Sequence, residues 1–307
     1  MAATGGFAMN LLLTGPTGFI GKAVLRMALA RGHFVTALQM PGESLPSDVA
    51  ATPSLRVCTG TLAAPPWDEL SKEPLDACLH TAWITTPGVY LESPDNNFFL
   101  EWSRQFARTF FERGGRYFMG LGSCAEYRPA RCPLAEDSAE LNDSTRYARC
   151  KNQLRLDLEA MAKKFNAGVC WGRVFYPFGV GEHPARLCSS LIRTLSRGKP
   201  VTLKTPHSTK DYIYVDDLAL AILLALEQRF TGALNLGTGR GVTVRQVADT
   251  IAALLGCPQL VREAEHPIED PLDFMVADNS RLRSLGWREV VGWEGGLERL
   301  CRHLTSI

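Results

Sequence analysis

Short apolar runs alternate with longer amphipathic segments along the first 175 residues. Brief apolar runs bounded by glycine, proline or polar residues are typical of buried strands, whereas apolar positions three and four apart are typical of helices. This pattern predicts strands at 11–13, 34–38, 55–58, 77–80, 117–121 and 168–174 and helices at 19–31, 96–113 and 147–165. The segment 41–53 is rich in proline, serine and glycine and is expected to be a loop. Alternating strands and helices indicate an α/β fold with a parallel, doubly wound sheet of the Rossmann type.

The alternation weakens beyond residue 180. Helices are expected at 187–197, 216–228 and 243–255, extended segments at 201–204, 212–215 and 233–236, and two short helices in the tail. Thr243 is the expected N-cap of the third of these helices, and Gly256 its end. We therefore expect a dinucleotide-binding Rossmann domain over 1–175 and a smaller mixed C-terminal substrate lobe over 176–307. The chain is expected to cross back between the two around 212–240.

Composition excludes several classes of function. The chain has 33 basic and 32 acidic residues, so its net charge of +1 gives no field that favours nucleic acid or an anionic membrane surface. Nine scattered cysteines without a C-x-x-C pair indicate neither a disulfide framework nor a zinc site, and no metal is expected. No apolar run approaches the ~20 residues that span a bilayer, and no export signal is recognised. We expect a cytoplasmic protein with reduced thiols.

A glycine-rich turn follows the first strand. Gly15 allows a tight turn, Gly18 lets a backbone approach a pyrophosphate, and Gly21 lets the next helix pack closely on the sheet. The free N–H groups of that helix then face the anion. The glycine spacing alone is a weak signal, but it lies inside a complete β-α-β unit that ends with the strand at 34–38. A dinucleotide site is therefore predicted here.

A second motif joins a phenol to an ammonium group. Tyr147 and Lys151 are four residues apart, so they share one face of a helix. A fixed cation beside a tyrosine stabilises the phenolate and lowers the pKa, which makes the tyrosine a usable general acid or base. Ser123 follows the fifth predicted strand and so lies at the carboxyl edge of the sheet, where ligands bind in such folds. A solvated helix face would explain the pair alone, but the glycine turn upstream makes coincidence the poorer explanation.

Together these motifs resemble those of the extended short-chain dehydrogenase/reductases, the NAD-dependent epimerase/dehydratase group that acts largely on nucleotide sugars. The resemblance covers nearly the whole chain. Its marks are the segments 14–21, 80–83, 122–127, 210–217, 235–239 and 277–282, together with Asn96, Tyr147 and Lys151.

The resemblance implies roles for individual residues. Tyr147 would exchange a proton with the sugar hydroxyl or carbonyl, and Ser123 would hydrogen-bond the same oxygen. Lys151 would lower the pKa of Tyr147 and hold the nicotinamide ribose, and Asn96, or its neighbour Asn97, would support the lysine. The positions that match the family's dinucleotide contacts are Gly15, Thr17, Gly18, Phe19, Ile20, Gly21, Gln39, Thr61, Leu62, His80 and Ala82, besides Tyr147 and Lys151. His80 is expected to be structural rather than to titrate.

Departures from the family pattern narrow the chemistry. Family 4,6-dehydratases carry adjacent acidic residues where this chain has Cys124 and Ala125, so a carboxylate pair for dehydration is missing. The cysteine and histidine of 3,5-epimerising reductases are replaced by Ala125 and Arg186. A tyrosine, Tyr176, stands where the substrate-binding asparagine is usual, and Lys210 replaces an arginine that reads the diphosphate. Lysine attracts phosphate as a point charge, without the planar fork of arginine. The expected substrate contacts are Ser123, Cys124, Ala125, Tyr176, Arg186 and Lys210.

Three functions fit this sequence. The simplest is a 4-keto reductase that acts on a nucleoside diphosphate sugar; the second is a nucleotide-sugar 4-epimerase that retains its cofactor. A non-catalytic, dinucleotide-binding regulatory module is the alternative from another class.

The helix from residue 96 carries more aromatic surface than one sheet contact requires, so it is either deeply buried within one subunit or packed on a partner chain. The family resemblance favours a homodimer.

The choice of dinucleotide depends on the end of the second strand. Family members that use NAD place an acidic residue there, which binds the adenosine ribose and repels a 2′-phosphate. This chain has Gln39, followed by Met40 where users of NADP often have arginine. Thr61 also replaces the aspartate that relatives direct at the adenine. Gln39 removes the repulsion between an acidic side chain and a 2′-phosphate, and Met40 adds no cation to attract that phosphate. The sequence therefore predicts use of both NAD(H) and NADP(H), with a slight lean to NADP(H).

Overall fold

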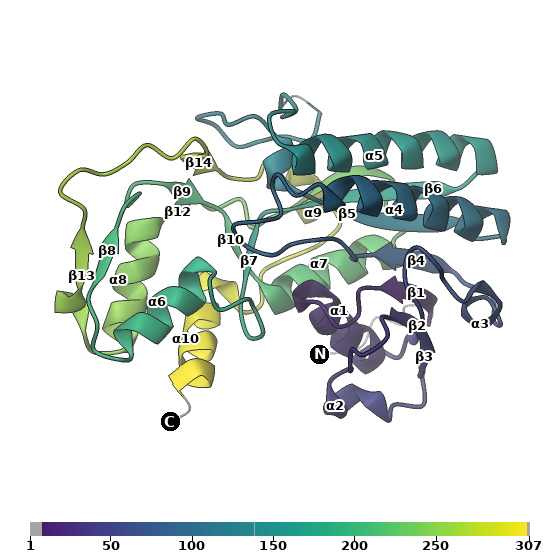
Figure 1. The fold of residues 1–307 in the computed structure, drawn as a ribbon, viewed down its shortest axis with the longest axis horizontal. Coiled ribbons are helices and arrows are strands. Elements are labelled where there is room, and N and C mark those ends of the chain that lie inside the picture. The colour runs from purple at the N-terminus through teal and green to yellow at the C-terminus, as the bar shows by residue number, and fades with distance from the viewer. Residues whose placement is uncertain (1–7, 138, 306–307) are drawn as a thin grey trace. The chain divides into compact units, whose positions relative to one another are not determined.

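The computed structural model describes residues 8–137 and 139–305, and the chain forms two compact units (Figure 1). The first unit contains the chain up to Glu126, then Leu141–Arg173 and Ala219–Leu234. The second contains Tyr127–Glu140, Val174–Leu218 and the chain from Asn235 onward. Each unit is made of several segments, so the chain passes between them more than once.

A seven-stranded sheet forms the centre of the first unit. Its strands are β1 (Asn10–Thr14), β2 (Phe34–Gln39), β3 (Leu55–Thr59), β4 (Ala77–His80), β5 (Tyr117–Ser123), β6 (Gly168–Val174) and β11 (Gly232–Leu236). The strand order is β11-β6-β5-β4-β1-β2-β3, with parallel pairing of β1 to both β2 and β4. The order reverses between β1 and β4, which is the switch point where such sheets bind ligands outside the carboxyl ends of the strands. The doubly wound parallel sheet expected from the sequence is confirmed.

Helices cover both faces of this sheet. They are α1 (Phe19–Ala30), α4 (Asp95–Glu112), α5 (Arg146–Phe165) and α7 (Val215–Glu227), with the short α2 (Ser47–Ala50), α3 (Trp67–Leu70) and η1 (Cys124–Glu126). Figure 1 shows α4 and α5 side by side. Between them and the sheet lies a core of large side chains that includes Phe106, Phe110, Phe118 and Trp171, each at most 1% exposed.

The expectation that 41–53 is entirely loop was wrong. Proline precedes α2 and is compatible with a helix start, and Asp48 within α2 accepts two hydrogen bonds from Arg26 at 2.7 and 3.1 Å. An exposed ion pair therefore links this short helix to α1.

The second unit is smaller and mixed, as expected. Its helices are α6 (Leu187–Leu195), α8 (Val244–Leu254), α9 (Ser280–Ser284), α10 (Gly292–Thr305) and η2 (Pro258–Leu260). Its short strands are β7 (Tyr176–Phe178), β8 (Val201–Leu203), β9 (Thr209–Lys210), β10 (Tyr212–Tyr214), β12 (Val242–Thr243), β13 (Val261–Glu263) and β14 (Phe274–Met275). Thr243 caps α8 as predicted, in a reciprocal capping box with Gln246.

Two buried aspartates join distant segments of this unit. Asp211 accepts hydrogen bonds from the backbone N–H groups of Thr238, Gly239 and Ala277, at 2.8–3.1 Å. Asp217 does the same for the segment 290–292 before and at the start of α10. These carboxylates accept hydrogen bonds from backbone N–H groups that a longer sheet would otherwise pair, because the strands here are only two or three residues long.

Candidate active site

The glycine turn between β1 and α1 is tightly packed. Gly15 has a φ of +68°, and a Cβ there would lie 2.7 Å from Thr81 Oγ1 and 3.0 Å from the nitrogen of Ala82. A Cβ at Gly21 would lie only 2.0 Å from the carbonyl oxygen of Gly15. Gly18, the N-cap, has no side chain to satisfy the first N–H groups of α1. The turn therefore presents bare backbone donors at the switch point of the sheet, an arrangement that fits a pyrophosphate.

His80 ends β4 beside this turn. Its Nδ1 lies 2.9 Å from Thr14 Oγ1 and its Nε2 lies 2.8 Å from Ser103 Oγ. Burial, aided by the charge of Lys151, lowers the pKa of His80 to about 3. The imidazole is therefore neutral at physiological pH and links β1, β4 and α4, a structural position as the sequence led us to expect.

Ser123 and Tyr147 meet at the carboxyl end of β5. Ser123 is the last residue of β5, and Tyr147 lies in the first turn of α5, which begins at a Thr145 cap. Burial raises the pKa of Tyr147, and a hydrogen bond with the Ser123 side chain lowers it by less. The direction is opposite to the one expected from a neighbouring cation. In the free protein, desolvation of the phenol is the main cause of the raised pKa, so Tyr147 stays protonated.

Lys151 is buried one turn further along α5. Its Nζ donates to the carbonyl oxygen of Leu121 at 2.8 Å and lies 3.8 Å from the centre of the Trp83 ring, but 5.8 Å from that of Tyr147. Desolvation lowers the pKa of Lys151 to about 7, partly offset by the attraction of Glu126. The ammonium is thus held mainly by a carbonyl and an indole face.

Asn96 supports the lysine through that indole. It is fully buried in α4, and its Oδ1 accepts a hydrogen bond from Trp83 Nε1 at 2.8 Å. Its Nδ2 donates to the carbonyl oxygens of Tyr90 and Ser93. Asn96 therefore fixes the loop after β4 and the ring against which Lys151 packs. Its neighbour Asn97 accepts a long contact from Cys150 instead.

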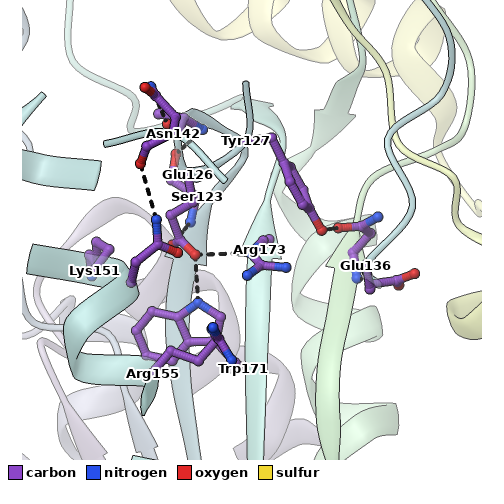
Figure 2. A network of polar contacts seen from close by, with 12 residues as sticks. Ser123, Glu126, Tyr127, Glu136, Asn142, Lys151, Arg155, Trp171 and Arg173 are labelled. Carbon is purple, nitrogen blue, oxygen red and sulfur yellow. Dashed lines mark hydrogen bonds and ion pairs between the residues drawn. The ribbon is translucent and has the colours of Figure 1, made fainter. Parts of the chain in front are cut away.

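Glu126, a buried carboxylate outside the predicted site residues, fixes the backbone of the serine. Glu126 accepts hydrogen bonds from the backbone nitrogen of Ser123 at 2.7 Å, Trp171 Nε1 at 2.8 Å and Arg173 Nε at 2.9 Å (Figure 2). Glu126 is 0% and Arg173 1% exposed, so this ion pair is shielded from solvent. Trp171 and Arg173 of β6 therefore hold Glu126, which in turn fixes the backbone of Ser123.

The positions next to Ser123 contain no carboxylate pair. Cys124 and Ala125 are buried in η1, and the nitrogen of Ala125 donates to Ser123 Oγ at 3.2 Å. Asn142 donates to the carbonyl oxygen of Ala125 at 3.1 Å. These residues shape the backbone around the serine and offer no acid for dehydration.

Four predicted cofactor positions lie in the glycine turn, at the end of β2 and on the loop after β3. Gln39 is the last residue of β2, and its Nε2 donates to the carbonyl oxygen of Glu43 at 2.5 Å. Thr17, in the glycine turn, donates to the carboxylate of the same Glu43 at 2.5 Å. Thr61 instead closes its own loop by accepting from the nitrogen of Ala64, and its neighbour Leu62 is buried. An acidic residue absent from the sequence predictions thus contacts two of them.

In the second unit, a cavity of about 240 Å³ brings together Tyr176, Arg186 and Lys210, the expected substrate contacts of that unit. Lys210 is buried, and its Nζ forms an ion pair with Asp270 at 2.8 Å and also donates to the carbonyl oxygen of Leu272. Its charge is therefore already balanced, contrary to the free point charge that we expected for a phosphate. Arg186, the N-cap of α6, is partly exposed.

The model of the NAD-dependent epimerase/dehydratase family matches residues 11–237, which include the glycine turn, Ser123, Tyr147 and Lys151. The chain belongs to this family. It is an enzyme of the extended short-chain dehydrogenase/reductase type, and the proteins similar to it include nucleotide-sugar epimerases, reductases and a dehydratase.

Relatives match this family member over nearly its whole length. The dTDP-4-dehydro-6-deoxyglucose reductase of Escherichia coli is 23% identical, over 96% of this chain and 97% of the relative. The UDP-glucose 4-epimerase of Corynebacterium glutamicum is 25% identical, over 91% and 90%. The solved structure of MoeE5 in complex with UDP-glucuronic acid and NAD superposes with a TM-score of 0.82 at 26% identity, covering 97% of this chain and 99% of that one.

The described residues contain no group of three or more histidine, cysteine, aspartate or glutamate side chains that could hold a metal ion. Within the same part of the chain, no helix has the length and apolar character needed to cross a membrane.

Proposed function

We propose that this enzyme is an NAD(P)-dependent oxidoreductase of nucleotide-activated sugars, most simply a 4-keto reductase. The observation that carries the proposal is the group of the partly buried Ser123 and the buried Tyr147 and Lys151 at the carboxyl end of β5, in the same unit as the bare glycine turn. A developing alkoxide needs both a proton and a second hydrogen-bond donor, and this group supplies them.

Each of the three side chains has a distinct role in this proposal. Tyr147 gives its proton to the carbonyl oxygen of the sugar, and Ser123 donates a hydrogen bond to the same oxygen. The raised pKa of Tyr147 keeps the phenol protonated before the reaction, as an acid requires. Lys151 carries the positive charge that stabilises the phenolate formed afterwards, and Asn96 positions it through Trp83.

The first unit holds the dinucleotide in this proposal. The N–H groups at Phe19, Ile20 and Gly21 bind the pyrophosphate, and Lys151 binds the nicotinamide ribose. The nicotinamide supplies the hydride, as in other nicotinamide enzymes. The lean to NADP(H) rests only on Gln39 and Met40, and the contacts of Glu43 weigh against it.

The second unit carries the substrate's nucleotide in this proposal. Its cavity has aromatic walls for a flat ring, with Tyr176 and Tyr212 at a centroid separation of 5.9 Å. Arg186 is the cation available to the diphosphate, since Lys210 is paired with Asp270. This assignment departs from the one drawn from the sequence, in which Lys210 attracted the phosphate.

A 4-epimerase that retains its cofactor is the second candidate. The similarity to the UDP-glucose 4-epimerase of Corynebacterium glutamicum supports it as strongly as the similarity to the reductase supports the first. Both reactions use the same proton donor and differ in their consumption of reduced cofactor.

We further propose a homodimer formed through α4 and α5. We also propose a cytoplasmic location, which the nine free thiols support.

The test is to mix the protein with NADH or NADPH and a panel of nucleoside diphosphate 4-keto sugars and follow the nicotinamide absorbance. A reductase consumes one reduced cofactor for each product, whereas an epimerase converts nucleoside diphosphate hexoses with no net consumption. Turnover of neither substrate set, with dinucleotide binding intact, would favour the non-catalytic regulatory module.

A further inference from the structure

We propose that Glu43 sets the dinucleotide preference of this protein, by supplying from a loop the carboxylate that family members place at the end of the second strand. Gln39 occupies that strand end here and carries no charge. The inference rests on the proposed binding of a dinucleotide at the glycine turn, and it predicts a preference for NAD(H) over NADP(H).

A tight turn brings Glu43 back to the strand end. Met40, Pro41, Gly42 and Glu43 form a turn closed by a hydrogen bond from the nitrogen of Glu43 to the carbonyl oxygen of Met40, at 3.2 Å. Proline at the second position and glycine at the third, here with a φ of +84°, are the residues that a type II turn favours. The sequence itself therefore specifies the reversal.

Two side chains then fix Glu43 at both ends. Gln39 donates to its backbone carbonyl oxygen, and Thr17 donates to its carboxylate, each at 2.5 Å. Thr17 belongs to the turn that faces the pyrophosphate, and Gln39 ends the strand that faces the adenosine ribose. The carboxylate consequently lies between the turn that faces the pyrophosphate and the strand end that faces the adenosine ribose.

The negative charge of Glu43 favours a ribose with free hydroxyl groups over one that carries a 2′-phosphate. Ribose hydroxyls donate hydrogen bonds to a carboxylate, whereas a 2′-phosphate brings like charge against it. The basic side chain of Arg26 on α1 is already paired with Asp48 at 2.7 Å. The described residues of the turn 40–43 contain no cation to offset the repulsion.

Calorimetric titration with NADH and NADPH, without any sugar substrate, tests the proposal. We expect the protein to bind NADH at least tenfold more tightly. Glu43→Gln keeps the size of the side chain and its ability to accept from Thr17, so NADH affinity should change by less than threefold while NADPH affinity rises at least fivefold. The preference should also shrink at high salt, because exposed charges are screened.

Glu112→Gln is the matched control. Glu112 is an exposed residue at the carboxyl end of α4, and its removal changes net charge equally but should leave the preference unaltered. Equal or tighter binding of NADPH by the unmodified protein, or an unchanged preference in Glu43→Gln, would overturn the proposal. Absence of binding by either dinucleotide would instead refute the proposed function. The sugar specificity of the enzyme does not affect these titrations, because they contain no sugar substrate.

Discussion

Burial sets the protonation of the candidate catalytic residues more strongly than their mutual charges do. The spacing of Tyr147 and Lys151 was expected to lower the pKa of the tyrosine, yet burial raises it. The same desolvation lowers the pKa of Lys151 to about 7 and that of His80 to about 3. Sequence spacing identified which groups meet, but it could not reveal the solvent exposure that governs their charge.

The lowered pKa of Lys151 predicts a pH-dependent contribution to stability. Its ammonium is penalised in the folded state, so the penalty is complete below pH 7 and is relieved as pH rises from 7 toward the ordinary value of 10.5. Relative to Lys151→Met, the unmodified protein should therefore gain about 2–3 kcal/mol of unfolding free energy between pH 6.5 and pH 9. Urea denaturation of both proteins at each pH measures this difference.

Lys163→Met is the control for that series. Lys163 lies on the same helix, in its last turn, but is exposed, so the difference from the unmodified protein should stay flat with pH. A flat difference for Lys151→Met as well would show that Lys151 keeps an ordinary pKa in the folded protein.

At the scale of elements, the glycine turn joins local sequence to binding. A Cβ at Gly21 would meet the backbone of Gly15, which cannot rotate away as a side chain could. Gly21→Ala should therefore displace the turn, cost about 1–3 kcal/mol of stability and weaken NADH binding at least tenfold. Urea denaturation and calorimetry provide the two readouts.

Gly295→Ala provides the comparison. Gly295 lies in α10, where an added Cβ would meet its nearest atom, on Val291, at an ordinary 3.5 Å. This substitution should stabilise the helix by about 0.5–1 kcal/mol and leave NADH binding unchanged. Unaltered NADH affinity in Gly21→Ala would show that close packing of this turn is not needed for the site.

Sequence patterns predicted most strands of the seven-stranded sheet. The strands Ala77–His80 and Gly168–Val174 have the expected bounds, because mostly apolar runs between loop segments are typical of buried strands. Some elements of two to four residues, such as α3 and β9, were missed, since they hold together by tertiary contacts rather than by periodicity.

The same division applies to the site. Ser123, Tyr147 and Lys151 follow from motif spacing, whereas Glu126 and Trp83 act through contacts with residues far along the chain. Glu43 is an intermediate case, because the Pro41–Gly42 dipeptide does predict a turn. The sequence does not show that Glu43 in this turn contacts Thr17, because Thr17 lies 26 residues upstream.

At the scale of the whole molecule, the exposed surface of α4 and α5 bears on assembly. Phe98 is 56% and Leu156 48% exposed, and Phe98 stacks on Trp102 with a centroid separation of 5.7 Å. Exposed apolar groups gathered on neighbouring helices are typical of an interface between protein chains. Phe106, Phe110 and Phe111 of α4 are buried within this chain, whereas Phe98 remains available to a partner chain.

We expect a homodimer of 33.8 kDa chains at micromolar concentration, and Phe98→Asp should convert it to monomer because a carboxylate replaces the apolar contact. Light scattering measures the mass. Val290→Asp removes a more exposed apolar side chain, 77% exposed, and should leave the dimer intact. A monomeric unmodified protein would refute the proposed interface.

The central claim is that Tyr147 delivers the proton while a sugar carbonyl receives hydride. Reduction of a nucleoside diphosphate 4-keto sugar with cofactor deuterated at the transferred position of C4, followed by mass spectrometry, tests it most directly in the unmodified protein and Tyr147→Phe. We predict one deuterium in each product molecule and a rate about 10²–10⁴-fold lower in Tyr147→Phe, with dinucleotide affinity unchanged. Transfer at a near-native rate without the phenol hydroxyl would contradict the claim.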